Sequence, residues 1–312
     1  MSDEKVWEKQ ALEHLLLENL KEQRRGRRWR TAVRMMTLLV FVGVAINLFD
    51  IDIAGKSSMG KHTALVDLQG EIAPDTKASA DAINASLQAA FENSESVGVI
   101  LRINSPGGSP VQAGIIHDEM LRLRAKYPQK SLHVVVEEIC ASGGYYVAAA
   151  GEKIYVDKAS LVGSIGVIMN GFGVTGLMEK LGIERRAITA GKNKALLDPF
   201  SKQDPKQKEF VQGMITEVHE QFITVVRAGR GDRLKETPDM FTGLVWNGAK
   251  SVELGLSDSL GSVDVVARDV FKASNIVDYT MKDNLAERVA KRFGAAMGEG
   301  ATRALMYGGQ LR

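Results

Sequence analysis

The stretch SVGVILRINSPGGSP, residues 96–110, decides the fold prediction for this chain. Its first part, SVGVILRIN, is largely apolar and β-branched, which predicts a buried strand. A proline and two glycines follow, and they predict a tight turn that leaves backbone N–H groups exposed. Residues 110–127 then show apolar side chains at helical spacing. The turn is therefore either a plain strand-to-helix connection or a site whose N–H groups hold an anion, such as an oxyanion or a phosphate.

A second joint of the same kind lies at ASGGYY, residues 141–146, after the apolar run SLHVVVEEI. Ser142 stands between small residues that leave room for a substrate carbonyl, and the N–H of Gly143 is placed to stabilise an oxyanion. The same position also suits a serine that only caps the next helix. If the two apolar runs pair as neighbouring strands, both turns emerge at one sheet edge. Ser142 then faces the backbone N–H groups of Gly107 or Gly108.

The rest of the chain repeats the alternation of strands and helices. Apolar runs with period 2 predict further strands, and helical spacing predicts further helices. Strands are expected at residues 62–72, 153–156, 164–168 and 183–189, and helices at 77–95, 142–150, 177–181 and 203–228. Strands separated by helices predict an α/β fold with a mainly parallel sheet, which places ligands at the strand-to-helix joints.

The composition excludes several classes of protein. The 312 residues are 45% hydrophobic and 25% charged, which is ordinary for a globular protein and excludes a disordered or polytopic membrane chain. Lys plus Arg number 40 and Asp plus Glu 38, so a net charge of +2 gives no indication of nucleic-acid binding. The single cysteine, Cys140, excludes an internal disulfide and a multi-cysteine zinc site. We expect Cys140 to be a buried small apolar residue, and we expect no metal because no acidic or histidine cluster has ligand spacing.

The N-terminal part carries a basic cluster followed by an apolar run. Seven Lys and Arg residues lie between residues 21 and 34, and residues 35–49 are almost wholly apolar. Residues 31–53 are long enough for one membrane span, and the basic flank predicts a cytoplasmic N-terminus. A signal-peptide core and a buried core helix are the alternatives. The expected organisation is a cytoplasmic segment at 1–30, a transmembrane anchor at 31–53, an extracytoplasmic domain at 54–282 and a C-terminal helix and tail at 283–312.

Three motifs together resemble the signal peptide peptidase A family: NSPGGS at 104–109, ASGGYY at 141–146 and VGSIGV at 162–167. The resemblance runs from Leu65 to Val266 and includes the later segments GLVWNGAK and LGLSD. It implies a membrane-anchored serine–lysine endopeptidase with the Clp protease/crotonase-like fold of repeated ββα units, and no cofactor. It also implies a location in the bacterial cytoplasmic membrane with the catalytic domain outside.

A serine nucleophile needs a base to take its proton, and the usual base is a histidine. No histidine lies shortly downstream of Ser142, where Clp protease carries its own; the five are His14, His62, His117, His133 and His219. The resemblance points instead to a lysine in AGKNKA, residues 190–195. The family pattern of glycine, two residues and lysine favours Lys194 as the general base. Lys192 is then a solvated loop lysine.

The resemblance also implies roles for the remaining site residues. Ser164, in the third motif, matches a serine that orients the lysine amine. The N–H of Gly143, with that of Gly107 or Gly108, matches the oxyanion hole. Peptide substrates, including signal-peptide remnants, would lie as an extended strand along a sheet edge. A homo-oligomeric ring would build each site from adjacent copies of the chain.

Three other functions compete with this interpretation. A related serine–lysine protease that processes specific membrane or periplasmic proteins would share all of these motifs. A crotonase-type acyl-CoA enzyme would share the fold and the oxyanion glycines, but it needs a CoA site and usually acidic catalytic residues. A non-catalytic membrane scaffold would have no need for Ser142, Ser164 and Lys194 together.

Overall fold

A computed structural model describes residues 27–41 and 60–281 of the chain. The chain divides into a unit of Met1–Ser58 with Lys282–Arg312, and a compact unit of Met59–Met281. Residues 27–41 form a helix. None of the described helices has the length and apolar character that crossing a membrane requires. The predicted anchor at 31–53 runs on past this helix into residues outside the described ranges, and the predicted tail at 283–312 lies wholly outside them.

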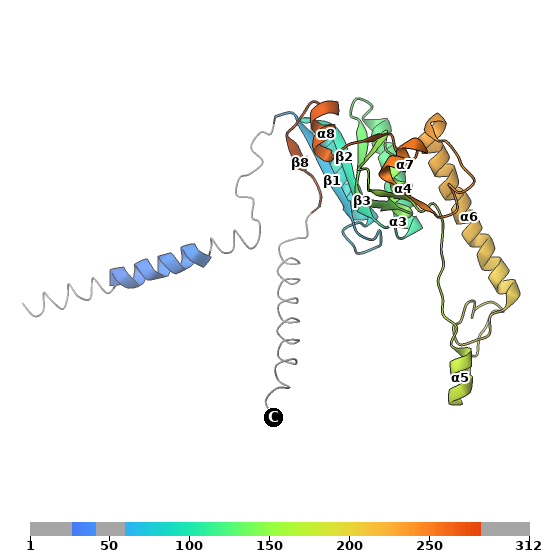
Figure 1. Cartoon of the computed structure of the whole chain (residues 1–312). Helices are drawn as coiled ribbons and strands as arrows, with labels where there is room; N and C mark the ends of the chain where they lie inside the picture. The colour runs from blue at the N-terminus through green and yellow to red at the C-terminus, as the bar shows by residue number, and fades with distance from the viewer. Residues whose placement is uncertain (1–26, 42–59, 282–312) are drawn as a thin grey trace, which may run out of the picture. The chain divides into compact units, whose positions relative to one another are not determined.

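A mostly parallel sheet forms the centre of the Met59–Met281 unit (Figure 1). Its strands follow the order β6 (Val245–Asn247), β5 (Leu161–Gly163), β3 (Leu132–Ala141), β2 (Ser96–Ser105), β1 (His62–Gln69) and β8 (Ile276–Asp278). Two further strands, β4 (Lys153–Val156) and β7 (Ser259–Leu260), continue from β3. Every pair is parallel except β5 with β6. The predicted α/β fold with a mainly parallel sheet is confirmed.

Strand β3 pairs with two different strands on the same side. Its first half, His133–Val135, pairs with β4, and its last residues, Ile139–Ala141, pair with β5. On its other side β3 pairs with β2, as the sequence predicts. The carboxyl ends of β2, β3 and β5 therefore lie next to one another, and both glycine-rich joints emerge there.

Helices α2 (Ala80–Glu92), α3 (Pro110–Lys126) and α4 (Gly143–Ala148) pack on one face of the sheet. The main core lies between them, and its members include Leu101, Ile103, Val134, Val136, Ile116 and Tyr145. A smaller core lies on the other face, where α8 (Val263–Val265) and η2 (Val266–Val270) cover Ile100 and Val135. Strands β1, β2 and β3 are mostly buried on both faces, which explains why they read as continuous apolar runs in the sequence.

The long helix α6 (Pro205–Arg230) has one half on the body and one half away from it. Phe222, Ile223 and Val226 in its C-terminal half are buried, whereas Phe210 near its start is 62% exposed. Residues 166–204 form an arm that contains α5 (Thr175–Leu181), which Figure 1 shows near the end of α6 farther from the sheet. The arm is closed on itself by a hydrogen bond from Val174 N–H to the Pro199 carbonyl oxygen.

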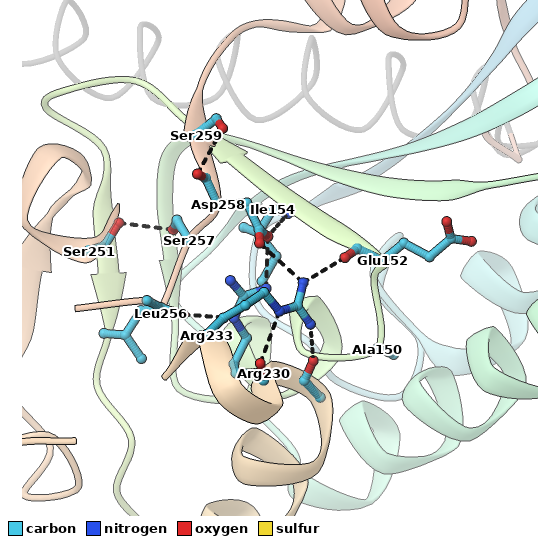
Figure 2. A network of polar contacts seen from close by, with 12 residues as sticks. Ala150, Glu152, Ile154, Arg230, Arg233, Ser251, Leu256, Ser257, Asp258 and Ser259 are labelled. Atoms are coloured by element: carbon cyan, nitrogen blue, oxygen red, sulfur yellow. Dashed lines mark hydrogen bonds and ion pairs between the residues drawn. The ribbon is translucent and has the colours of Figure 1, made fainter. Parts of the chain in front are cut away.

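A network of arginines fixes the C-terminal end of α6 to the body (Figure 2). Arg230 is 1% exposed, and it donates to the Gly255 carbonyl oxygen and to the Asp258 carboxylate at 2.9 and 2.8 Å. Asp258 also accepts from Arg233 and from the N–H of Ile154 in β4. The buried half of α6 is therefore attached to the sheet through charge-assisted hydrogen bonds.

Two predicted strands are absent from the described residues. The strand at this point in the chain is Leu161–Gly163 rather than residues 164–168, because Ser164 has a φ of 52° and leaves the ladder. Residues 183–189 form neither helix nor strand and are exposed. Several short C-terminal elements carry no prediction from the sequence, namely β6, α7 (Gly248–Glu253), β7, α8, η2 and β8.

Candidate active site

Ser142 occupies a strained turn between β3 and α4. Its φ of 52° and ψ of −123° are unusual for a residue with a side chain. Its N–H donates to the Gly163 carbonyl oxygen at 2.9 Å, which anchors the turn to β5. The hydroxyl makes no capping hydrogen bond to α4, although Ser142 is the residue before the helix. The geometry therefore disfavours the helix-cap role and matches the sharp strand-to-helix turn that exposes a nucleophile.

Ser164 lies beside Ser142 at the end of the neighbouring strand. Ala141 in β3 pairs with Gly163 in β5, and the two serines are the next residues of their strands. Ser164 has the same φ of 52°, and its N–H donates to the Leu244 carbonyl oxygen at 2.7 Å. The fold thus brings together two of the residues that the sequence singles out.

The first glycine joint contacts the Ser142 turn directly, and its two glycines differ. The N–H of Gly107 donates to the Ser105 hydroxyl at 3.1 Å, so it is already used. The N–H of Gly108 has no acceptor among the described residues, and an ideal Cβ built on Gly143 lies 3.3 Å from this nitrogen. Gly143 begins α4, where N–H groups have no acceptor within the helix. Two free N–H groups, of Gly108 and Gly143, therefore lie beside Ser142.

The backbone of Ile72 holds this joint in place. Ile72 N–H donates to the Gly107 carbonyl oxygen at 2.8 Å, and the Ile72 carbonyl oxygen accepts from Ser109 N–H at 2.7 Å. Gly107 and Gly108 have φ values of 103° and 146°, which only glycine adopts readily. The Gly108 N–H is thus fixed in direction before any ligand arrives.

An apolar pocket of about 140 Å³ adjoins Ser142 and Gly143. Residues 166–168 form one wall, and Val218, Gln221 and Phe222 of α6 form another. Ligand sites for drug-sized molecules measure roughly 300–1,000 Å³. The pocket therefore has room for a single amino-acid side chain rather than for a nucleotide cofactor. The three α6 residues carry no signal in the sequence that would mark them as part of a site.

Both candidate lysines lie on the arm. Lys192 and Lys194 are exposed in a run of turns, and Lys194 N–H donates to the Gly191 carbonyl oxygen at 3.1 Å. No hydrogen bond joins the Lys194 amine to Ser142 or Ser164 within the described part of one chain.

The other candidate groups are occupied or buried. Burial raises the pKa of the Cys140 thiol, which is fully inaccessible in β3, so it is a core residue as expected. Burial also lowers the pKa of His133, which packs against Tyr155 and Phe271. His219 lies with its Nε2 atom 3.2 Å from the Ile165 carbonyl oxygen. Residues 27–41 and 60–281 contain no group of three or more His, Cys, Asp or Glu side chains that could hold a metal ion.

Comparison with known proteins places these residues in a family. Residues 124–276, which include Ser142, Ser164 and Lys194, match the family described as Peptidase family S49. A putative protease, slr0021, from Synechocystis is 31% identical over 209 residues, which cover 66% of this chain and 72% of that protein. A putative signal peptide peptidase SppA from Enterococcus faecium is 30% identical over 184 residues, 59% of this chain and 53% of that protein.

A third similar protein bears a different name. A Na(+)/H(+) antiporter NhaA from Brucella melitensis is 43% identical over 177 residues, which are 57% of this chain. This chain covers 24% of that antiporter and 53% of the Enterococcus protein, so it spans about a quarter of the first and about half of the second. Together with the motifs and the geometry around Ser142, the match to the S49 family and to the Synechocystis protease shows that this chain belongs to peptidase family S49, a serine protease family.

Proposed function

We propose that this chain is a serine endopeptidase with Ser142 as the nucleophile. The observation that carries the proposal is the position of Ser142, on a positive-φ turn beside Ser164, with the free N–H groups of Gly108 and Gly143 next to it. Fixed backbone donors next to a serine are what the tetrahedral intermediate of acyl transfer requires. Gly108 and Gly143 are the proposed oxyanion hole, and Gly107 positions them.

The proposed general base is Lys194, with Ser164 orienting its amine. The neutral amine takes the Ser142 hydroxyl proton as the oxygen attacks the peptide carbonyl. The oxyanion then accepts from the Gly108 and Gly143 N–H groups. Lys194 protonates the leaving amine, and water resolves the acyl-enzyme. A lysine can do this only where its charged form is disfavoured, as burial away from water does.

The lysine of each site would come from a neighbouring copy of the chain. Lys194 lies on an arm whose apolar side chains are unusually exposed: Phe172 is 86% exposed, Ile168 79% and Ile188 101%. Several large apolar side chains exposed on one segment are typical of a protein–protein interface. A homo-oligomeric ring would cover the arms, and it would bury Lys194 next to the serines of the adjacent copy.

The proposed substrates are extended apolar peptides, signal-peptide remnants among them. The pocket beside Ser142 is mainly apolar and of side-chain size, which disfavours an acyl-CoA enzyme. The relative from Enterococcus faecium is named a putative signal peptide peptidase. A bacterial membrane location follows from the proposed anchor at 31–53, and a Clp protease/crotonase-like fold from the forked parallel sheet with its two glycine joints.

The test is peptidase activity of the full chain in detergent on a fluorogenic apolar peptide. Ser142→Ala and Lys194→Ala should each abolish turnover, while Lys192→Ala should retain it. Ser164→Ala should leave a small residual activity because it removes only the orientation of the lysine. Activity that survives Ser142→Ala would refute the proposed nucleophile. Equal losses in the two lysine variants would refute the choice between them.

A further inference from the structure

The segment that follows Ser164 is held by few hydrogen bonds. Strand β5 ends at Gly163, and no helix or strand begins before α5. Ser164 N–H donates to the Leu244 carbonyl oxygen, and Val174 N–H donates to the Pro199 carbonyl oxygen. Across the nine residues between them, one hydrogen bond reaches the segment in the described part of the chain. It joins His219 Nε2 to the Ile165 carbonyl oxygen at 3.2 Å.

The chemistry of this bond fixes what His219 can do. A carbonyl oxygen only accepts, so His219 Nε2 must carry a hydrogen. The Nε2–H tautomer of the neutral ring satisfies this, and so does the imidazolium. The same bond leaves this nitrogen without a lone pair for a serine hydroxyl proton, so His219 does not act through Nε2 as a base.

His219 joins two walls of the pocket beside Ser142. Its neighbours on α6, Val218, Gln221 and Phe222, line that pocket from one side. Ile165 is fully buried, and residues 166–168 directly after it line the pocket from the other side. The arginine network at Arg230 fixes this half of α6 to the body. The hydrogen bond of His219 thus joins α6 to the segment that follows Ser164.

We propose that His219 is a positioning residue that fixes residues 165–168 against α6. By doing so it sets the width of the apolar pocket and supports the turn at Ser164. The effect of His219 on catalysis rests on the proposed peptidase function. Its hydrogen bond to the Ile165 carbonyl oxygen does not depend on that function. This difference allows the two to be tested separately in the same full-length chain.

Two variants of His219 separate the effect of its hydrogen-bond donor from the effect of its aromatic ring. The side-chain amide nitrogen of glutamine lies as many bonds from Cα as histidine Nε2, so His219→Gln keeps a donor at the same reach. His219→Phe keeps the ring and removes the donor. Thr216→Val is the matched control on the same helix, because among the described residues the Thr216 hydroxyl bonds only to the Gln212 carbonyl oxygen of α6.

The first readout is nicking of residues 165–173 by chymotrypsin in the detergent-solubilised full chain, followed by mass spectrometry. His219→Phe should be nicked about fivefold faster than the wild type, the change expected for the loss of one hydrogen bond. His219→Gln and Thr216→Val should match the wild type. Equal nicking in His219→Phe and the wild type would overturn the proposal, whether or not the chain is an active peptidase.

The second readout compares two peptides that differ in the residue on the acyl side of the cleaved bond. It is the kcat/KM for the leucine peptide divided by the kcat/KM for the alanine peptide. His219→Phe should lower this ratio by about tenfold, since misplacement of a pocket wall by about 1 Å costs up to about 100-fold. His219→Gln should restore it. If His219→Gln lost activity on both the leucine and the alanine peptide as completely as Ser142→Ala, His219 would be a general base instead of a positioning residue. An unchanged ratio with a uniform loss in His219→Phe would show a purely structural role.

Discussion

A Cβ added to Gly107 would lie 2.7 Å from the Cβ of Ser142. The same atom would lie 2.8 Å from the Ala141 carbonyl oxygen and 2.8 Å from the Gly143 nitrogen. The two glycine-rich joints, which are separated by a helix and a strand in the sequence, are therefore in direct backbone contact. This contact explains why position 107 needs a glycine. The requirement is steric, because the Gly107 N–H is bonded to the Ser105 hydroxyl and is not a free donor.

We predict that Gly107→Ala abolishes peptidase activity. The side chain would push against the Ser142 turn, and the φ of 103° adds backbone strain. The expected cost is about 2–3 kcal/mol in the free energy of unfolding, together with a loss of turnover of at least about 100-fold. Chemical unfolding and peptide hydrolysis would be measured on the same preparation.

The matched control is Gly114→Ala in α3, where an added Cβ meets nothing within 4 Å. This variant should be at least as stable as the wild type, because alanine is favoured over glycine in a helix interior. Full activity in Gly107→Ala would show that the first joint does not take part in the site.

The contrast between Gly107 and Gly108 shows what the sequence could and could not predict. The motif alone places both glycines at the end of a buried strand, and the structure confirms that position. The choice of a donor depends on which N–H already has an acceptor. For Gly107 that acceptor is the Ser105 hydroxyl. The backbone conformation decides that the Gly107 N–H points at this hydroxyl, and the residue types alone do not show it.

Some of the strands predicted from apolar runs are correct and the one at 183–189 is wrong, again for a reason that the residue types do not show. The runs at β1, β2 and β3 are buried within this chain, and their predictions are correct to within a few residues. Residues 183–189 show a similar pattern, yet Ile188 is 101% exposed and no strand forms. An apolar pattern predicts that a segment is buried. It does not identify whether the covering surface belongs to the same chain or to a partner. Strands of three residues, such as β6 and β8, are too short for any periodic pattern.

We predict that Val218→Phe narrows the range of substrates. Val218 is partly exposed in the pocket wall, so a larger side chain would fill the roughly 140 Å³ beside Ser142 without disturbing the core. Peptides with leucine or phenylalanine on the acyl side of the cleaved bond should lose about tenfold or more in kcat/KM, whereas alanine peptides should change little.

Val225→Phe, two turns further along α6 and outside this pocket, is the control and should keep the wild-type preference. If Val218→Phe cleaved the large-residue peptides as well as the wild type, the pocket would not be the site that reads the substrate side chain.

We predict that Asp258→Asn destabilises the body by about 3 kcal/mol at neutral pH. Burial raises the pKa of the Asp258 carboxyl, but the hydrogen bond and charge of Arg230 outweigh burial, so the pKa lies below its ordinary value. Removing one partner leaves the buried Arg230 guanidinium uncompensated, which costs about 3–5 kcal/mol. Asp269→Asn at an exposed pair should have no measurable effect.

The pH dependence of unfolding gives a second check on Asp258. Because its folded pKa is lowered, its contribution is complete above the unfolded pKa of about 3.9 and disappears as the pH falls through the folded value. The wild type should therefore lose stability over this acid range, and Asp258→Asn should lose less. Parallel curves for the two proteins would contradict the role of the ion pair.

Whether Ser142 of one copy works with Lys194 of another can be measured by mixing two inactive variants. Ser142→Ala and Lys194→Ala would be co-expressed with different affinity tags, and doubly tagged assemblies would be purified and given an apolar fluorogenic peptide. If adjacent copies share each site, about a quarter of the sites in a random mixture regain both residues, and activity returns to about that fraction of the wild type. If both residues act within one chain, every site remains defective, and a mixture as inactive as either variant alone would show that adjacent copies do not share sites.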